Sequence, residues 1–136
     1  MMLVKTRLGR SAIHGIGLFA DQDIPKGSRV WEFTHGFDQQ IPREQLEKIP
    51  EPARADFLKY SYTSKKNGHY YILCCDDARF FNHSEDPNVI SRPNGNGDED
   101  LDVAARDIQR GEELTCDYRS FEAAFTSEML QSQNGN

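Results

Sequence analysis

The stretch "ARFFNHSEDPNVI", residues 78–90, decides how this sequence is interpreted. Two phenylalanines lead directly into Asn82, His83 and Ser84, so three hydrogen-bonding side chains follow an aromatic pair typical of a core. The "EDPN" part has ordinary turn chemistry, because Pro fits the second position of a turn and Asn is favoured in turns. A turn does not explain the polar triplet. A metal site, a nucleophile–base pair, a structural turn and a backbone-lined pocket are the alternatives.

Two of these alternatives are poorly supported. A metal site would use His83 and Asp86, but no cluster of further His or Cys ligands accompanies them. A nucleophile–base pair of Ser84 and His83 is disfavoured because adjacent side chains diverge rather than hydrogen-bond. The chain has three cysteines without C-x-x-C spacing, so we expect neither a zinc site nor a disulfide framework. A structural role, in which Asn82 and Ser84 hold a turn, stays open.

The overall composition narrows the class of protein. A length of 136 residues fits one domain, and a net charge of −6 disfavours direct binding to nucleic-acid phosphates. No apolar run approaches the roughly 20 residues that span a membrane, and the N-terminal "MMLVKTRLGR" lacks a signal-peptide segment. Few cysteines indicate a reducing compartment. We therefore expect a soluble, metal-free, intracellular domain, cytoplasmic or, in a eukaryote, nuclear.

Short strand-like segments separated by turn signals dominate the chain. They are "LVKTRL" (3–8), "GLFA" (17–20), "SRVWEF" (28–33), "HYYILC" (69–74), "LDVAAR" (101–106) and "ELTCDY" (113–118). Asn67-Gly68 predicts a tight hairpin. Pro42 and Pro52 each open a helical pattern, which predicts a helical insert at about 37–59. We expect a mostly-β α+β domain over residues 1–121, followed by a short C-terminal helix and frayed tail over 122–136.

Two further motifs are ambiguous when each is taken alone. "HGIGLFA" places Gly15 and Gly17 around one residue, which suits a bent strand start or a close approach of another group to the backbone. "GEELTCDY" ends in Tyr118, which alone is most simply a packed aromatic with its hydroxyl satisfied.

Taken in order, the three motifs resemble those of the SET-domain lysine methyltransferases. That family has a G-x-G near its start, then R-F-x-N-H-S-x-x-P-N, then G-E-E-L-x-x-D-Y. This chain has "GIG" at 15–17, "RFFNHSEDPN" at 79–88 and "GEELTCDY" at 111–118. The resemblance covers residues 3 to about 121. It implies a β-clip fold of small curved sheets in which the second and third motifs meet in a knot-like crossing.

The resemblance also implies an activity, namely transfer of a methyl group from S-adenosylmethionine to a lysine side chain. It assigns the catalytic role to Tyr118, whose hydroxyl orients the methyl group and the amine. The cofactor-binding residues that it implies are His14, Gly15, Ile16, Gly17, Asn82, His83, Tyr118 and Phe121. The substrate-binding residues are Phe33, Tyr60, Tyr62 and Cys116.

The chain departs from the family pattern at several places. Phe33 stands where a tyrosine is common, so we expect Tyr60 or Tyr62 to supply the hydroxyl contact instead. Cys116 stands where Phe or Tyr is usual, which predicts a roomy pocket that allows di- or trimethylation; a small core residue is the alternative. We expect no zinc-binding tail, and Phe121 with Phe125 could cover the cofactor instead.

The partner is expected to be a lysine-containing protein, a histone or another basic protein, and a homodimer is an open alternative. The acidic segment 98–102 favours a solvated loop over a contact with a basic substrate. A catalytically silent SET-fold module that docks a basic protein is the competing function, since fold does not prove activity.

Overall fold

The computed structural model describes residues 1–66, 68–96 and 99–120. Phe121, Phe125 and the C-terminal helix expected over 122–136 lie outside these residues. The strands are β1 (Thr6–Arg10), β2 (Ile16–Ala20), β3 (Arg29–Trp31), β4 (Gln39–Pro42), β5 (Tyr62–Thr63), β6 (Tyr70–Leu73), β7 (Asn82–His83), β8 (Val89–Arg92), β9 (Leu101–Ala104) and β10 (Thr115–Cys116). The helices are α1 (Arg43–Leu46), α2 (Glu51–Tyr60) and two 3-10 turns, η1 (Asp77–Phe80) and η2 (Tyr118–Ser120).

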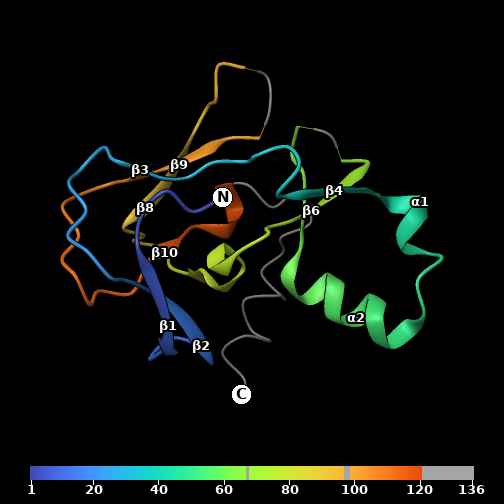
Figure 1. Ribbon diagram of the computed structural model, residues 1–136, viewed down its shortest axis with the longest axis horizontal. Coiled ribbons are helices and arrows are strands. Elements are labelled where there is room, and N and C mark those ends of the chain that lie inside the picture. The colour runs from blue at the N-terminus through green and yellow to red at the C-terminus, as the bar shows by residue number, and fades with distance from the viewer. Residues whose placement is uncertain (67, 97–98, 121–136) are drawn as a thin grey trace.

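The strands form small separate sheets, which confirms the expected mostly-β fold. Two antiparallel sheets have the orders β3-β9-β8 and β4-β6-β5, and β1 pairs with β2 in a hairpin. Figure 1 shows the β3-β9-β8 sheet on one side of the molecule, with β10 below it, and the helices α1 and α2 on the other side. Residues of both parts line the cavity beside Tyr118. The site described below therefore lies between the sheet and the helical insert.

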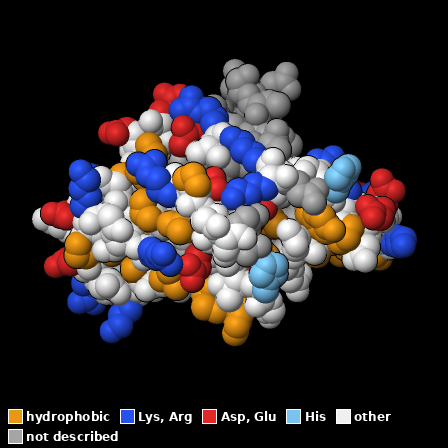
Figure 2. All heavy atoms as spheres, turned by 90° about the horizontal axis from the view of Figure 1, so that it is seen from above, with side chains coloured by type: hydrophobic (Ala, Val, Ile, Leu, Met, Phe, Trp, Pro, Cys, Tyr) orange, Lys and Arg blue, Asp and Glu red, His pale blue; other side chains and the backbone are white. Residues whose placement is uncertain are grey.

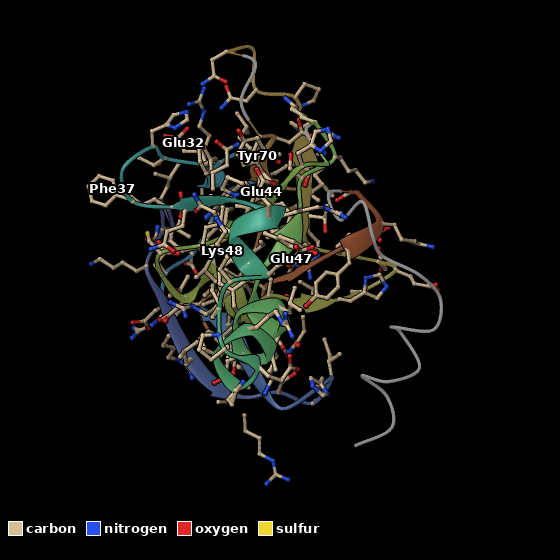
Figure 3. The ribbon with its side chains drawn as sticks, turned by 90° about the vertical axis from the view of Figure 1, so that its right-hand side faces the viewer. Glu32, Phe37, Glu44, Glu47, Lys48 and Tyr70 are labelled. Carbon is tan, nitrogen blue, oxygen red and sulfur yellow. The ribbon has the colours of Figure 1, made fainter. Side chains whose placement is uncertain are left out.

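The segment expected to form a helical insert contains β4, α1 and α2. Pro42 immediately precedes α1, and Pro52 lies in the first turn of α2, where its missing N–H has no intrahelical partner to lose. Strand β4 was not predicted. Seen from this side, Glu44, Glu47 and Lys48 project from the insert, and Phe37, 59% exposed, lies at its edge (Figure 3).

The predicted hairpin between β5 and β6 is also present. The two strands are antiparallel, with Tyr62 opposite Ile72 and Thr63 opposite Tyr71. Its Asn67 lies outside the described residues.

The core is built from aliphatic side chains contributed by almost every sheet. The large aliphatic side chains with 0–1% exposure are Leu18, Ile24, Val30, Ile72, Val89, Ile108 and Leu114. Each such burial contributes about 1.5–3 kcal/mol relative to exposure. Phe81 is 7% exposed and belongs to this core, whereas Phe80 is only partly buried against it. Phe81 therefore anchors the segment that leads into Asn82.

The second and third sequence motifs meet in a two-stranded parallel sheet. Strand β7 pairs with β10, with Asn82 opposite Thr115 and His83 opposite Cys116. The side chain of Asn88 fixes the same crossing: its Nδ2 donates to the Glu113 carbonyl at 2.8 Å and its Oδ1 accepts from Thr115 N at 2.9 Å. The expected meeting of the two motifs is thus confirmed. The described residues contain no helix with the length and apolar character needed to cross a membrane.

Candidate active site

Asn82 connects all three sequence motifs through its side-chain amide. Nδ2 lies 3.1 Å from the carbonyl of His14, 3.3 Å from that of Ile16 and 2.8 Å from Glu113 Oε1. It also lies 3.1 Å from Ser11 Oγ. An amide carries only two N–H groups, so these acceptors share them. Asn82 is 5% exposed, and its amide therefore positions the backbone of the expected cofactor-binding segment.

Glycine is required at Gly17 because the Glu113 carboxylate packs against its α-carbon. A Cβ at this position would lie 2.2 Å from Glu113 Oε1. That carboxylate is held by Ser11, whose hydroxyl donates to Oε1 at 2.7 Å. Gly15 is constrained differently: it has φ +47°, and no atom lies within 4 Å of a Cβ built there. The first glycine therefore supplies conformation and open space, and the second supplies close packing.

The backbone at 14–17 has the features of a polar ligand site. His14 Nδ1 is buried and has no hydrogen-bond partner among the described residues. Leaving a buried polar atom unsatisfied costs about 1–3 kcal/mol, so such atoms are expected to have a partner in the functional state. Ile16 is 54% exposed, so this segment faces outward as well as toward Asn82. These residues fit a polar cofactor lying against the segment.

His83 and Tyr118 are brought together by the crossing of β7 and β10. The backbone N–H of Tyr118 donates to His83 Nδ1 at 3.1 Å, and the two rings lie 5.4 Å apart. Because Nδ1 accepts this bond, the proton of the neutral imidazole is on Nε2. His83 is 8% exposed. It therefore acts as a buried support for Tyr118.

The Tyr118 hydroxyl donates a hydrogen bond to the carbonyl oxygen of Phe81. This bond engages the phenolic proton and fixes the ring, so the oxygen can act only as an acceptor toward any other group. The arrangement suits orientation of a reacting group, and it does not suit a general base.

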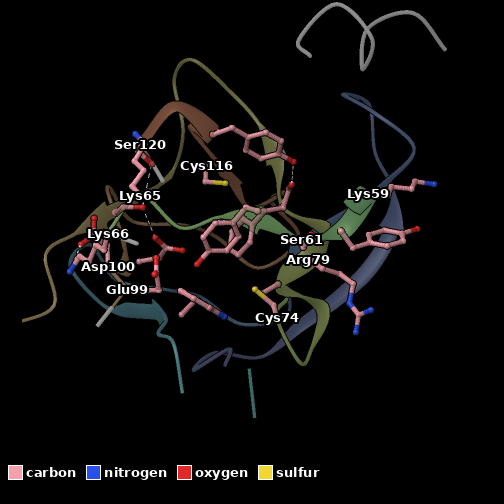
Figure 4. A pocket seen from close by; sticks show the side chains of 18 residues that line it. Lys59, Ser61, Lys65, Lys66, Cys74, Arg79, Glu99, Asp100, Cys116 and Ser120 are labelled. Carbon is pink, nitrogen blue, oxygen red and sulfur yellow. Dashed lines mark hydrogen bonds and ion pairs between the residues drawn. The ribbon is translucent and has the colours of Figure 1, made fainter. Parts of the chain in front are cut away.

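A cavity of about 150 Å³ adjoins Tyr118. Aromatic side chains of five residues line it: Trp31, Tyr60, Tyr62, Phe81 and Tyr118. Its remaining lining residues are Lys59, Ser61, Lys65, Lys66, Cys74, Ala78, Arg79, Ser91, Glu99, Asp100, Asp102, Cys116 and Ser120. In Figure 4, Cys116 and Cys74 lie on opposite sides of the cavity, and Glu99 lies between them at one end.

The structure places three of the four expected substrate-binding residues on this cavity. Tyr60, Tyr62 and Cys116 line it together with Tyr118. Phe33 is absent from the described lining residues: it is 6% exposed, belongs to the core and packs edge-to-face on His35 with ring centroids 4.9 Å apart. Phe33 therefore lies in the core and not on the cavity, where a hydroxyl at this position would have been expected to contact the substrate.

Burial keeps two of the lining groups uncharged. It raises the pKa of the Tyr62 phenol and that of the Cys116 thiol well above their usual values. Cys116 is 3% exposed and lies both in the core and on the cavity. A small side chain here leaves room that a tyrosine would fill.

Two acidic residues of the cavity were missed by sequence reasoning. The expected solvated loop at 98–102 is wrong for Glu99, which is 8% exposed and accepts a hydrogen bond from the buried Ser64. Asp102 lies in β9, where burial raises its pKa to about 6. The only sequence signal was the continuity of Asp102 with the strand "LDVA". Within the described part of the chain, no group of three or more His, Cys, Asp or Glu residues could hold a metal ion.

Comparison with known proteins gives the family. The sequence profile of the SET domain matches residues 15–119, which include all three motifs. The chain therefore belongs to the SET domain family.

Named relatives and solved structures agree with this assignment. Histone-lysine N-methyltransferase 2B of Homo sapiens is 35% identical over 124 residues, which are 81% of this chain and 4% of that protein. The H3 lysine-4 specific histone-lysine N-methyltransferase of Schizosaccharomyces pombe is 34% identical over 130 residues, 85% of this chain and 13% of that protein. The chain thus spans only a small part of each relative.

Among solved structures, an autoinhibited Polycomb Repressive Complex 2 of Chaetomium thermophilum bound to S-adenosylmethionine shares the fold. Its TM-score is 0.64 at 24% identity, with 96% of this chain and 17% of that chain covered.

Proposed function

We propose that the chain is an S-adenosylmethionine-dependent protein-lysine N-methyltransferase. The observation that carries the proposal is the parallel pairing of β7 with β10, which holds Tyr118 against His83 and over an aromatic cavity. Membership of the SET domain family supports the same activity. The cofactor would supply a methyl group on a sulfonium; a lysine amine would form a bond to the methyl carbon as the C–S bond breaks and the neutral thioether leaves.

The cofactor would be held by the segment His14–Gly17 and by the residues that flank the crossing. His14 Nδ1, buried without a partner among the described residues, and the open space over Gly15 support this assignment. Asn82 supports it indirectly, by fixing the backbone at 14–16. His83 and Tyr118 complete the proposed site, and Phe121, also expected there, lies outside the described residues.

The substrate amine must lose its proton before it can attack. A free lysine with a pKa of 10.4 is neutral in about 1 part in 2,500 at pH 7, which costs roughly 4.6 kcal/mol. Removing the amine from water among aromatic side chains lowers this cost. The chain's further contribution is orientation, because in-line placement of the reacting atoms supplies much of the acceleration. Tyr118, whose hydroxyl is held by the Phe81 carbonyl, would define that placement together with Cys116 and Tyr62.

The degree of methylation follows from the size of residue 116. A buried cysteine leaves space beside Tyr118 for an amine that already carries methyl groups, so we propose di- or trimethylation.

The proposed substrate is a lysine side chain of a histone or of another basic protein. The enzyme would encounter this protein inside the cell, and in the nucleus if the source is eukaryotic. Acidic and basic side chains both appear on the face in Figure 2, and the net charge of −6 disfavours direct binding to nucleic-acid phosphates.

Cofactor binding and methyl transfer separate this function from a silent binding module. Calorimetry with S-adenosylmethionine measures the first, and transfer of radiolabelled methyl groups to proteins of a cell lysate measures the second. We expect both. Cofactor binding without transfer to any protein would favour the silent module.

A further inference from the structure

The wall of the cavity opposite the helical insert carries two carboxylates without a counter-ion. Glu99 bonds to the hydroxyl of Ser64, and Asp102 Oδ1 accepts from Ser91 Oγ at 2.7 Å. No cation pairs with either carboxylate within residues 1–66, 68–96 and 99–120. Because buried charges in proteins are almost always paired, the buried Glu99 and the half-buried Asp102 on one cavity indicate that the cavity receives a cation.

The basic side chains that also line the cavity are engaged elsewhere. Lys66 Nζ pairs with Asp100 at 3.3 Å, and Lys65 Nζ donates to the carbonyl of Arg119. Arg79 Nε donates to the carbonyl of Asp76 at 3.3 Å, and Lys59 Nζ lies 5.3 Å from the centre of the Tyr60 ring. Figure 4 shows Lys59 and Arg79 across the cavity from Glu99. The protein's own cations therefore leave both carboxylates available.

The placement of Asp102 follows from sheet register. In the β3-β9-β8 sheet, Asp102 is opposite Trp31 on one neighbouring strand and opposite Ser91 on the other. Residues directly opposite one another project from the same face of a sheet. All three line the cavity. A row of indole, carboxylate and hydroxyl thus faces the space beside Tyr118.

We propose that Glu99 and Asp102 are the counter-ions of the substrate's ammonium group, so that the cavity binds the target lysine and its methylated products as cations. The identification of the cation as a lysine rests on the proposed function. Aromatic side chains with carboxylates are the combination that recognises alkylammonium ions, since the ring faces attract the positive charge. A carboxylate also stabilises the protonated amine. The pair therefore acts in binding and opposes the loss of the proton that precedes methyl transfer.

Binding of a simple cation tests the site without any methyl transfer. Trp31 is the only tryptophan of the chain and lines the cavity, so its fluorescence reports occupancy directly. We expect saturable binding of tetramethylammonium and much weaker binding of neopentyl alcohol, a neutral molecule of similar shape. Glu99→Gln with Asp102→Asn should weaken tetramethylammonium binding by on the order of 10-fold or more.

Glu47→Gln is the matched control, because it removes one charge from an exposed residue of the insert and should leave binding unchanged. Equal binding of the cation and the alcohol would overturn the proposal, as would unchanged cation binding in the double variant.

Kinetics with a lysine peptide then separate this inference from the function on which it rests. Glu99→Gln should raise KM for the peptide by on the order of 10-fold, with a much smaller change in kcat. A fall in kcat with KM unchanged would contradict the inference without contradicting the proposed methyltransferase activity. If cation binding depends on Glu99 and Asp102 but the chain transfers no methyl group, the proposed function is wrong and the cation site is still supported.

Discussion

The amide of Asn82 donates a hydrogen bond to the carboxylate of Glu113 at 2.8 Å, and these two residues come from the two motifs that cross. The same carboxylate oxygen accepts from Ser11 at 2.7 Å and lies against Gly17. The first, second and third motifs therefore constrain one another through one half-buried carboxylate. A substitution in any one of the three motifs should therefore alter the packing of the other two.

This mutual constraint predicts different behaviour for the two glycines. Gly17→Ala would force a methyl group into the Glu113 carboxylate and should lower the free energy of unfolding by about 1–3 kcal/mol. Gly15→Ala meets no neighbouring atom and pays only the left-handed backbone penalty of about 1–2 kcal/mol. Urea denaturation measures both.

Combining each change with Glu113→Ala distinguishes the two causes. Removing the carboxylate relieves the clash at Gly17, so a double-mutant cycle should give a coupling of about 1 kcal/mol or more for Gly17 with Glu113 and almost none for Gly15 with Glu113. Equal couplings would show that the carboxylate does not determine the need for glycine.

Residue 116 should control how many methyl groups are added. Cys116 is 3% exposed and lies on the cavity, so Cys116→Tyr would fill space beside Tyr118 and shift the products toward monomethyl-lysine. Mass spectrometry of a methylated peptide measures the distribution. Cys116→Ser, which keeps the volume, is the control. An unchanged distribution in Cys116→Tyr would mean that Cys116 is only a core residue.

Asp102 should make the folded protein less stable as pH rises. Burial raises its pKa from 3.8 to about 6, so the folded state binds a proton more tightly than the unfolded chain. The free energy of unfolding therefore falls as pH increases from about 4 to 6, and the penalty is complete above pH 6. Asp102→Asn removes it and should stabilise the protein at pH 7.5 by on the order of 1–3 kcal/mol, with almost no effect near pH 4.

Thermal or urea unfolding of both proteins at the two pH values checks this prediction. A residue that costs stability is expected where it serves binding. Destabilisation by Asp102→Asn at pH 7.5 would show that the carboxylate has a stabilising partner.

The sequence predicted the crossing well and the cavity only in part. The motifs around Asn82 and Tyr118 are long enough to show the resemblance to the SET-domain family, and that resemblance implied their meeting; the hairpin of β5 with β6 followed from the local Asn67-Gly68 turn signal. The cavity depends on contacts between segments distant in sequence. Phe33 was expected to contact substrate, yet packing on His35 places it in the core. Glu99 looked like a solvated loop residue, because its bond to Ser64, 35 residues away, has no local signature.

The central claim is tested most directly by the reaction itself. A library of lysine peptides is incubated with S-adenosylmethionine and either the wild-type chain or Tyr118→Phe, and the products are measured by mass spectrometry. The account predicts peptides that gain methyl groups on lysine with the wild type, and kcat lower by on the order of 10²-fold in Tyr118→Phe, because the ring loses its bond to Phe81 and the reacting atoms lose their alignment. Equal rates in the two proteins would contradict the role of Tyr118, and no methylation of any peptide by a wild-type chain that binds the cofactor would contradict the activity.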